Sequence, residues 1–81
     1  MKIEQIQKNQ LFVTDDQGNQ FFQSYDSIIA RRDPAGVVTL DQRFWDYSMT
    51  TSKYRNQFLG ETKKETEKKI KAGVYRLDNL N

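Results

Sequence analysis

Three turn signals divide the first 42 residues of the chain into short strand-like runs. They are "KN" at residues 8–9, "DDQGN" at 15–19 and "DPAG" at 33–36, and the runs between them are rich in β-branched and aromatic residues. Gly18 tolerates a positive φ, and Pro34 fits the first central position of a β-turn. The pattern predicts strands within residues 2–42 that form a four- or five-stranded antiparallel meander.

The pattern changes to a helical one after residue 49. In "TTSKYRNQFLG", Tyr54 and Phe58 lie four residues apart and so share one helix face. This predicts a helix over about 50–59, with Thr50 or Thr51 as its N-cap and Gly60 at its C-terminal end.

A second helix and a last strand are predicted after Gly60. "TKKE" is a capping box in which Thr62 and Glu65 satisfy free backbone amides reciprocally, so a helix is expected over about 62–72. "VYRL" then alternates as a short strand at about 74–77, which we expect to return to an edge of the sheet.

These elements predict an α+β fold in a single domain of residues 1–81. The expected architecture is an antiparallel sheet with two short helices on one face and a C-terminal strand. Tyr54 and Phe58 would close the core. Phe21 and Phe22 are adjacent in a strand and must point to opposite faces, so one of them lies outside a core that is covered on one side only.

The residue types that are missing exclude several kinds of chemistry. The chain has no histidine and no cysteine, so it contains no imidazole base, thiolate nucleophile or ordinary zinc site, and no glycine-rich phosphate loop occurs. The carboxylates Asp26, Asp33, Asp41 and Asp46 remain as candidates for acid–base work or Mg²⁺ binding, but Asp33 and Asp41 are more simply explained as turn and strand-end residues. We expect a protein that is not an enzyme and that has no cofactor or metal.

Residues 44–60, "FWDYSMTTSKYRNQFLG", combine aromatic rings with hydroxyls and cations. Exposed rings and arginines are typical anchors of protein–protein contacts. We predict a partner-binding surface formed by Trp45, Tyr47, Lys53, Tyr54 and Arg55. Hydroxyls and cations at a helix start could also hold an anion, although a cap followed by surface charge explains the same residues.

The charge of the chain is unevenly distributed. Residues 1–52 hold five basic and seven acidic side chains, a net charge of −2, whereas residues 53–76 hold eight basic and three acidic ones, a net charge of +5. Lys64, Lys68 and Lys71 share one face of the second helix, and Arg76 could join them. This face could follow a nucleic-acid backbone. The i,i+4 pairs Glu65–Lys69 and Glu67–Lys71 indicate instead a solvated face.

No apolar run approaches the roughly 20 residues that span a bilayer, and residues 1–10 lack the apolar segment of a signal peptide. We therefore expect a soluble, intracellular protein that does not bind membranes.

The stretches "FFQSYDSIIA", "VTLD", "WDYSMTTSKYRNQFLGE" and "TKKETEKKIKAGVYRLDNLN" resemble a family of small bacteriophage-encoded proteins of unknown function. The resemblance covers roughly residues 20–81 and implies a phage product in the cytoplasm of an infected bacterial host. Many such proteins bind a host protein, and some inhibit defence or transcription systems. The leading hypothesis is thus a host-protein-binding accessory protein; the alternatives are a nucleic-acid-binding protein and a small structural component that self-associates through an uncovered sheet face or edge.

Overall fold

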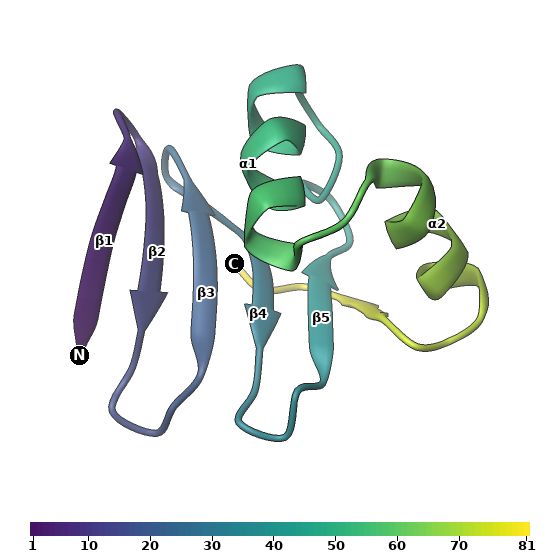
Figure 1. The fold of residues 1–81 in the computed structure, drawn as a ribbon, viewed down its shortest axis with the longest axis horizontal. Coiled ribbons are helices and arrows are strands. Elements are labelled where there is room, and N and C mark those ends of the chain that lie inside the picture. The colour runs from purple at the N-terminus through teal and green to yellow at the C-terminus, as the bar shows by residue number, and fades with distance from the viewer.

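A computed structural model describes residues 1–81 (Figure 1). It confirms the α+β class, with one six-stranded sheet in the order β1-β2-β3-β4-β5-β6 and two helices. The elements are β1 Lys2–Gln7, β2 Gln10–Thr14, β3 Gln20–Ser24, β4 Ser27–Arg32, β5 Val38–Asp41, α1 Met49–Leu59, α2 Lys63–Lys71 and β6 Arg76–Asp78.

The sheet differs from the prediction mainly in the direction of its last strand. β1 to β5 form the expected antiparallel meander, and the strand expected at about 74–77 is β6, which returns to an edge of the sheet as predicted but runs parallel to β5. The chain leaves β5, passes through both helices and re-enters beside β5 at the edge, and such a crossover is what a parallel neighbour requires. The sheet is therefore mixed.

Asp15 and Asp33 shape two of the three predicted turns through the same pattern of hydrogen bonds. The Asp15 carboxylate accepts hydrogen bonds from the backbone N–H groups of Gln17 and Asn19, and Asp33 accepts them from Ala35 and Val37. An aspartate that binds amides two and four residues ahead fixes a turn locally. These loops are set by local sequence, which explains why they could be predicted.

The helices confirm most of the predicted boundaries, with one correction. The Thr62–Glu65 capping box opens α2, and Gly60 ends α1 in the left-handed region at φ 70°. The N-cap of α1 is Ser48, and not Thr50 or Thr51: its side chain accepts from the backbone N–H of Thr51 at 3.1 Å. Thr51 is instead fully buried, and its hydroxyl lies 3.0 Å from that of Ser24 in β3.

The core lies between the sheet and α1. Phe12, Phe22 and Phe58 form an aromatic group with ring centroids 5.2 to 6.2 Å apart, and Tyr54 lies beside it in the core cluster. Tyr54 and Phe58 are both 9% exposed, which confirms that this face of the helix closes the core. The buried apolar residues are Phe22, Ile29, Ala30, Val38, Leu40, Tyr54, Phe58 and Tyr75.

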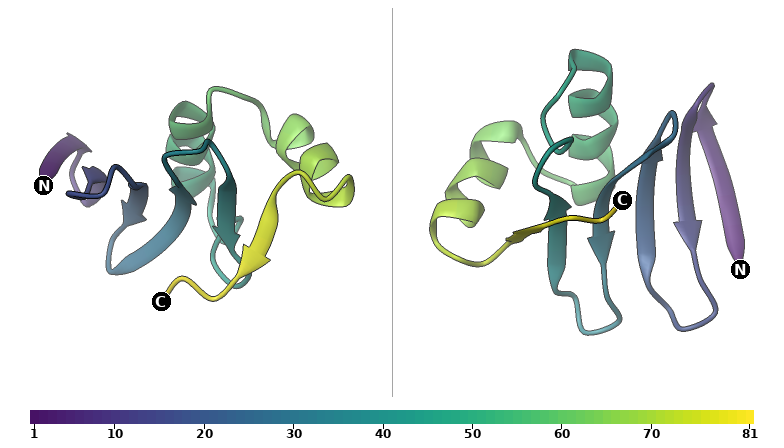
Figure 2. Two further views of the ribbon diagram at one scale, coloured as in Figure 1. Left: turned by 90° about the horizontal axis from the view of Figure 1, so that it is seen from below. Right: turned by 180° about the vertical axis from the view of Figure 1, so that it is seen from behind.

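Both helices lie on the same side of the sheet (Figure 2, left), as predicted. α1 covers the centre of that face, whereas α2 lies beyond β5 (Figure 1). The opposite face is open over β1 to β3, and it carries Ile3, Val13 and Phe21, which are paired in one row across these strands. Phe21 and Phe22 thus point to opposite faces, since Phe22 is fully buried and Phe21 is only partly so.

The segment after β6 is held against β4 and β5 on the side away from the helices (Figure 2, right). The Asn81 side chain donates to the backbone carbonyl of Ile28 at 3.0 Å and accepts from its N–H at 2.8 Å. Asp41, at the end of β5, accepts from the Leu80 N–H and the Asn81 amide through one oxygen. Neither helix has the length and apolar composition that crossing a membrane requires.

Candidate functional site

A shallow depression of about 650 Å³ opens between the first turns of α1 and α2. We call it the 46–63 depression, and its lining includes Asp46, Tyr47, Met49, Lys53, Asn56 and Lys63. Two of the five residues predicted to contact a partner, Tyr47 and Lys53, therefore lie on one surface.

Two apolar side chains project from this surface into solvent. Met49, the first residue of α1, is 91% exposed, and Tyr47 is 45% exposed. The Tyr47 ring packs edge to face on Phe44 at a centroid distance of 5.5 Å, which holds it in place while leaving it accessible. Exposed and fixed rings of this kind are well suited to contact another protein, because little side-chain entropy is lost on binding.

The other predicted residues lie beneath the surface. Tyr54 is in the core, Arg55 is fully buried, and Trp45 is partly buried against the core. The Arg55 guanidinium lies 5.1 Å from the centroid of the Trp45 ring and donates to the Trp45 carbonyl. Sequence reasoning placed Arg55 at the surface because charged residues rarely occur fully buried, and the compensating partners come from an aperiodic loop.

Arg55 fastens the loop before α1 to the helix. One terminal nitrogen lies 3.3 Å from both Asp46 Oδ1 and Ser52 Oγ, and the other donates to Asn56 Oδ1 at 3.0 Å. The Nε of Arg55 has no hydrogen-bond partner. A buried guanidinium that binds several acceptors fixes their relative positions, so the loop that carries Tyr47 has a rigid base.

Asp46 connects this base to α2. It accepts from Lys63 Nζ at 2.7 Å and from the Ser52 hydroxyl at 2.9 Å, in addition to its contact with Arg55. Burial opposes ionisation, but hydrogen bonds from Lys63, Ser52 and Arg55 outweigh it and hold the pKa of Asp46 below its ordinary value. The hydrogen bond from Lys63 to Asp46 also raises the pKa of Lys63. The depression therefore has a charged floor that stays ionised at neutral pH.

A second buried network joins α2 to the segment before β6. The Glu61 carboxylate accepts from Lys69 Nζ and the Tyr75 hydroxyl, both at 2.7 Å, and from the Thr66 hydroxyl at 2.6 Å. Although burial acts in the opposite direction, these bonds hold the pKa of Glu61 below its ordinary value. The predicted Glu65–Lys69 pair is thus wrong: Lys69 binds Glu61, which sequence spacing along one helix could not indicate.

The basic face of α2 consists of Lys64, Lys68 and Lys71, which are all exposed. None of the three forms an ion pair, since the expected Glu67–Lys71 pair is absent and Glu67 lies 3.9 Å from Lys63 instead. Arg76 does not join this face. It is paired with Thr39 in a row that also contains Arg31, and this row points away from the helices.

The two acidic residues explained from the sequence as turn and strand-end residues have these roles in the structure. Asp33 forms a turn, and Asp41 is 1% exposed, with its second oxygen accepting from the backbone N–H groups of Arg43 and Phe44. Its pKa is lowered, because its hydrogen bonds outweigh the effect of burial. No group of three acidic side chains that could hold a metal ion occurs.

Comparison with known proteins gives one match. Residues 1–73 match the model of a family of unknown function, DUF8033. The chain belongs to the DUF8033 family. The match includes the N-terminal hairpin, whereas the resemblance noted from the sequence began at about residue 20. No curated protein and no solved structure matches the chain.

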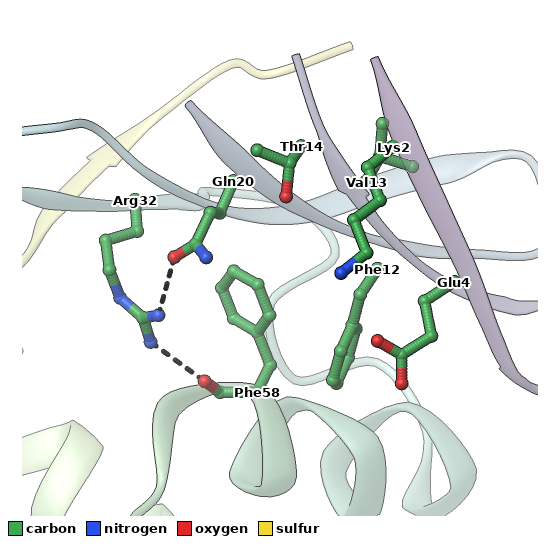
Figure 3. A pocket seen from close by; sticks show the side chains of 8 residues that line it. All are labelled: Lys2, Glu4, Phe12, Val13, Thr14, Gln20, Arg32 and Phe58. Atoms are coloured by element: carbon green, nitrogen blue, oxygen red, sulfur yellow. Dashed lines mark hydrogen bonds between the residues drawn. The ribbon is translucent and has the colours of Figure 1, made fainter. Parts of the chain in front are cut away.

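The protein has a second hollow that sequence reasoning missed, between α1 and the strands β1 to β4 (Figure 3). We call it the β1–α1 hollow; its volume is about 200 Å³ and its lining includes Lys2, Glu4, Phe12, Gln20, Arg32 and Phe58. Arg32 donates to Gln20 Oε1 at 2.9 Å and to the Phe58 carbonyl at 2.8 Å, so both terminal nitrogens of its guanidinium have an acceptor within the protein. Lys2 and Glu4 form no ion pair and lie on the β1 side.

Proposed function

We propose that this DUF8033 protein is a non-enzymatic, phage-encoded accessory protein that binds a host protein in the cytoplasm of the infected bacterium. A component of a defence or transcription system is the proposed class of target. The resemblance of residues 20–81 to small phage proteins supports the setting.

The observation that carries the binding proposal is the exposure of Met49 and Tyr47 on a rigid base. Met49 is almost entirely accessible although it begins a helix whose next turn contains the buried Tyr54 and Arg55. Beneath it, Arg55 and Asp46 hold the loop and both helices together. Apolar anchors on a preorganised support, bordered by Lys53 and Lys63, match the composition of a protein-contact surface. Trp45, Tyr54 and Arg55 position this surface from below.

The test is retention of bacterial proteins by the immobilised DUF8033 protein, with two variants as the comparison. We expect a specific partner to be retained by the wild type and by Val74→Ser, and to be lost from the double variant Tyr47→Ser/Met49→Ser. Val74 is the matched control because it is 58% exposed and does not line the depression. A partner that the double variant retains equally would refute the proposed surface, and recovery of nucleic acid without any specific protein would refute the proposed function.

The alternative function is nucleic-acid binding, and the lack of ion pairs on the basic face of α2 favours it. Three unpaired lysines on one helix face can each neutralise a phosphate and release counterions. The experiment is binding of single- and double-stranded DNA at increasing salt.

Replacing Lys64, Lys68 and Lys71 by glutamine would reduce the salt-dependence slope by about 2 to 3 if each contacts one phosphate. The control replaces Lys8, Arg43 and Lys53 by glutamine, which removes the same charge from exposed residues outside α2. Equal slopes for the two variants would show that the basic face is not the binding site.

A further inference from the structure

β1 leaves one edge of the sheet without a partner. It hydrogen-bonds only to β2, and it lies at the far side of the sheet from α2 (Figure 1). Five of its six residues are exposed, and only Ile6 reaches the core. An edge strand of this kind presents a row of unpaired N–H and C=O groups to which another strand can bond.

Symmetry restricts how two copies could join through this edge. In an antiparallel pair of identical strands that continues one sheet, the two-fold axis is perpendicular to the sheet, so the helices of both copies lie on the same side. Directly opposed residues then belong to the same sheet face, and the pairing must be centred on a residue. Within the part of β1 that precedes its irregularity, the possible centres are Lys2, Ile3, Glu4 and Gln5.

The charges and the regularity of β1 distinguish these four registers. Centring on Lys2 places two ammonium groups directly opposite each other, and centring on Glu4 does the same with two carboxylates, so both registers are unfavourable. Centring on Gln5 extends the pairing over the register shift between Gln5 and Gln7, where the strand departs from regular geometry. Centring on Ile3 opposes the two Ile3 side chains and places Lys2 opposite Glu4 twice.

We propose that β1 is a self-association edge, and that it pairs antiparallel with β1 of a second copy in the register centred on Ile3. Lys2 and Glu4 have no ion-pair partner within their own chain, although both lie at the β1–α1 hollow (Figure 3). In the dimer each Lys2 meets a Glu4 of the other copy. Ile3, which is 60% exposed in the single chain, meets its own counterpart.

The open face of the sheet becomes continuous across this junction. Ile3, Val13 and Phe21 form one row within the chain, and the dimer joins two such rows end to end at Ile3. Charged side chains on an edge strand normally oppose pairing with other chains. In β1, Lys2 and Glu4 oppose pairing with strands that lack the complementary order of charges. A second copy of β1 offers an opposite charge to each of them. The proposal is independent of the host-protein contact at the 46–63 depression.

The experiment is sedimentation equilibrium of the untagged protein over a range of concentrations. The interface is small, so we expect a reversible dimer of about 19 kDa, twice the 9.6 kDa of one chain, with a dissociation constant on the order of 10 µM to 1 mM. Lys2→Glu or Glu4→Lys alone would replace two attractive pairs by two repulsive ones and weaken the dimer by about tenfold or more. The double variant Lys2→Glu/Glu4→Lys exchanges the charges and would restore it.

Two controls make the same changes of charge outside the register. Lys8→Glu lies in the turn after β1 and Asp26→Lys lies in the turn between β3 and β4, and both residues are exposed. We expect them to leave the dimer within about twofold of the wild type.

A protein that stays monomeric up to millimolar concentration would overturn the proposal. So would a dimer that the single charge reversals do not weaken, or one that the double exchange does not restore, because only the Ile3-centred register opposes Lys2 to Glu4.

Discussion

Replacing Arg55 by methionine removes the guanidinium while keeping most of the volume of a fully buried side chain. The change leaves the Trp45 carbonyl and Asn56 Oδ1 without their donor. Asp46 also loses its contact with Arg55 but still accepts hydrogen bonds from Lys63 and Ser52. A hydrogen bond from a charged group contributes about 1.5 to 3 kcal/mol, and part of the loss is offset because the buried charge no longer has to be desolvated. We therefore expect the free energy of unfolding to fall by about 2 to 4 kcal/mol.

This loss is large for a chain of 81 residues, whose total stability is expected to be about 4 to 12 kcal/mol. Trp45 is the only tryptophan and its ring lies 5.1 Å from the guanidinium, so its fluorescence reports on the site directly. Urea unfolding followed by this fluorescence and by circular dichroism would show a midpoint lowered by about 1.3 to 4 M, if the slope is about 1 to 1.5 kcal/mol per molar urea.

The matched control is Arg43→Met, which removes an arginine that is exposed and forms no ion pair. We expect its midpoint to stay within about 0.5 M of the wild type, since surface substitutions away from specific contacts change stability little. If Arg55→Met also stayed within this range, the assignment of Arg55 as the residue that holds the loop to α1 would be wrong.

Three further predictions concern other polar side chains that form hydrogen bonds. The pKa of Glu61 is lower in the folded than in the unfolded protein. The ionised carboxylate therefore stabilises the fold above the unfolded pKa, and this stabilisation is lost as the pH falls through the folded pKa. Between pH 7 and pH 3 we expect the urea midpoint of Glu61→Gln to fall less than that of the wild type. Asp41→Asn cannot accept all four donors, and hydrogen exchange should become faster at Leu80 and Asn81, with the amides of β2 as the reference. Ser48→Ala removes the N-cap of α1 and should cost about 1 kcal/mol in thermal or urea unfolding, whereas Thr50→Ala, at a residue that does not cap the helix, should cost less than half of that.

Features that depend on local sequence could be predicted. The loops at Asp15 and Asp33, the end of α1 at Gly60 and the capping box at Thr62 each involve contacts within about four residues. The core face of α1 was also predictable, because Tyr54 and Phe58 follow the helical period.

Features that depend on distant contacts could not be predicted. β6 is parallel to β5 because of a path through two helices, and no property of "VYRL" specifies its direction. Arg55 is buried because Trp45 and Asp46 return to it from a loop without periodicity. The N-cap of α1 could not be predicted, because Ser48 has several neighbouring hydroxyl residues that could also cap a helix. Only the path of the loop determines which of them is the N-cap.

The parallel placement of β6 has a consequence for the order in which the chain folds. β1 to β5 pair with their neighbours in sequence, so each hairpin closes a short loop, whereas β6 and Asn81 bond to β5 and β4 across both helices. Long loops cost more entropy to close, and contacts of this kind form late. Substitutions at Asn81 are therefore expected to accelerate unfolding while leaving the refolding rate nearly unchanged. The contacts of the last strand would then determine how long the protein stays folded.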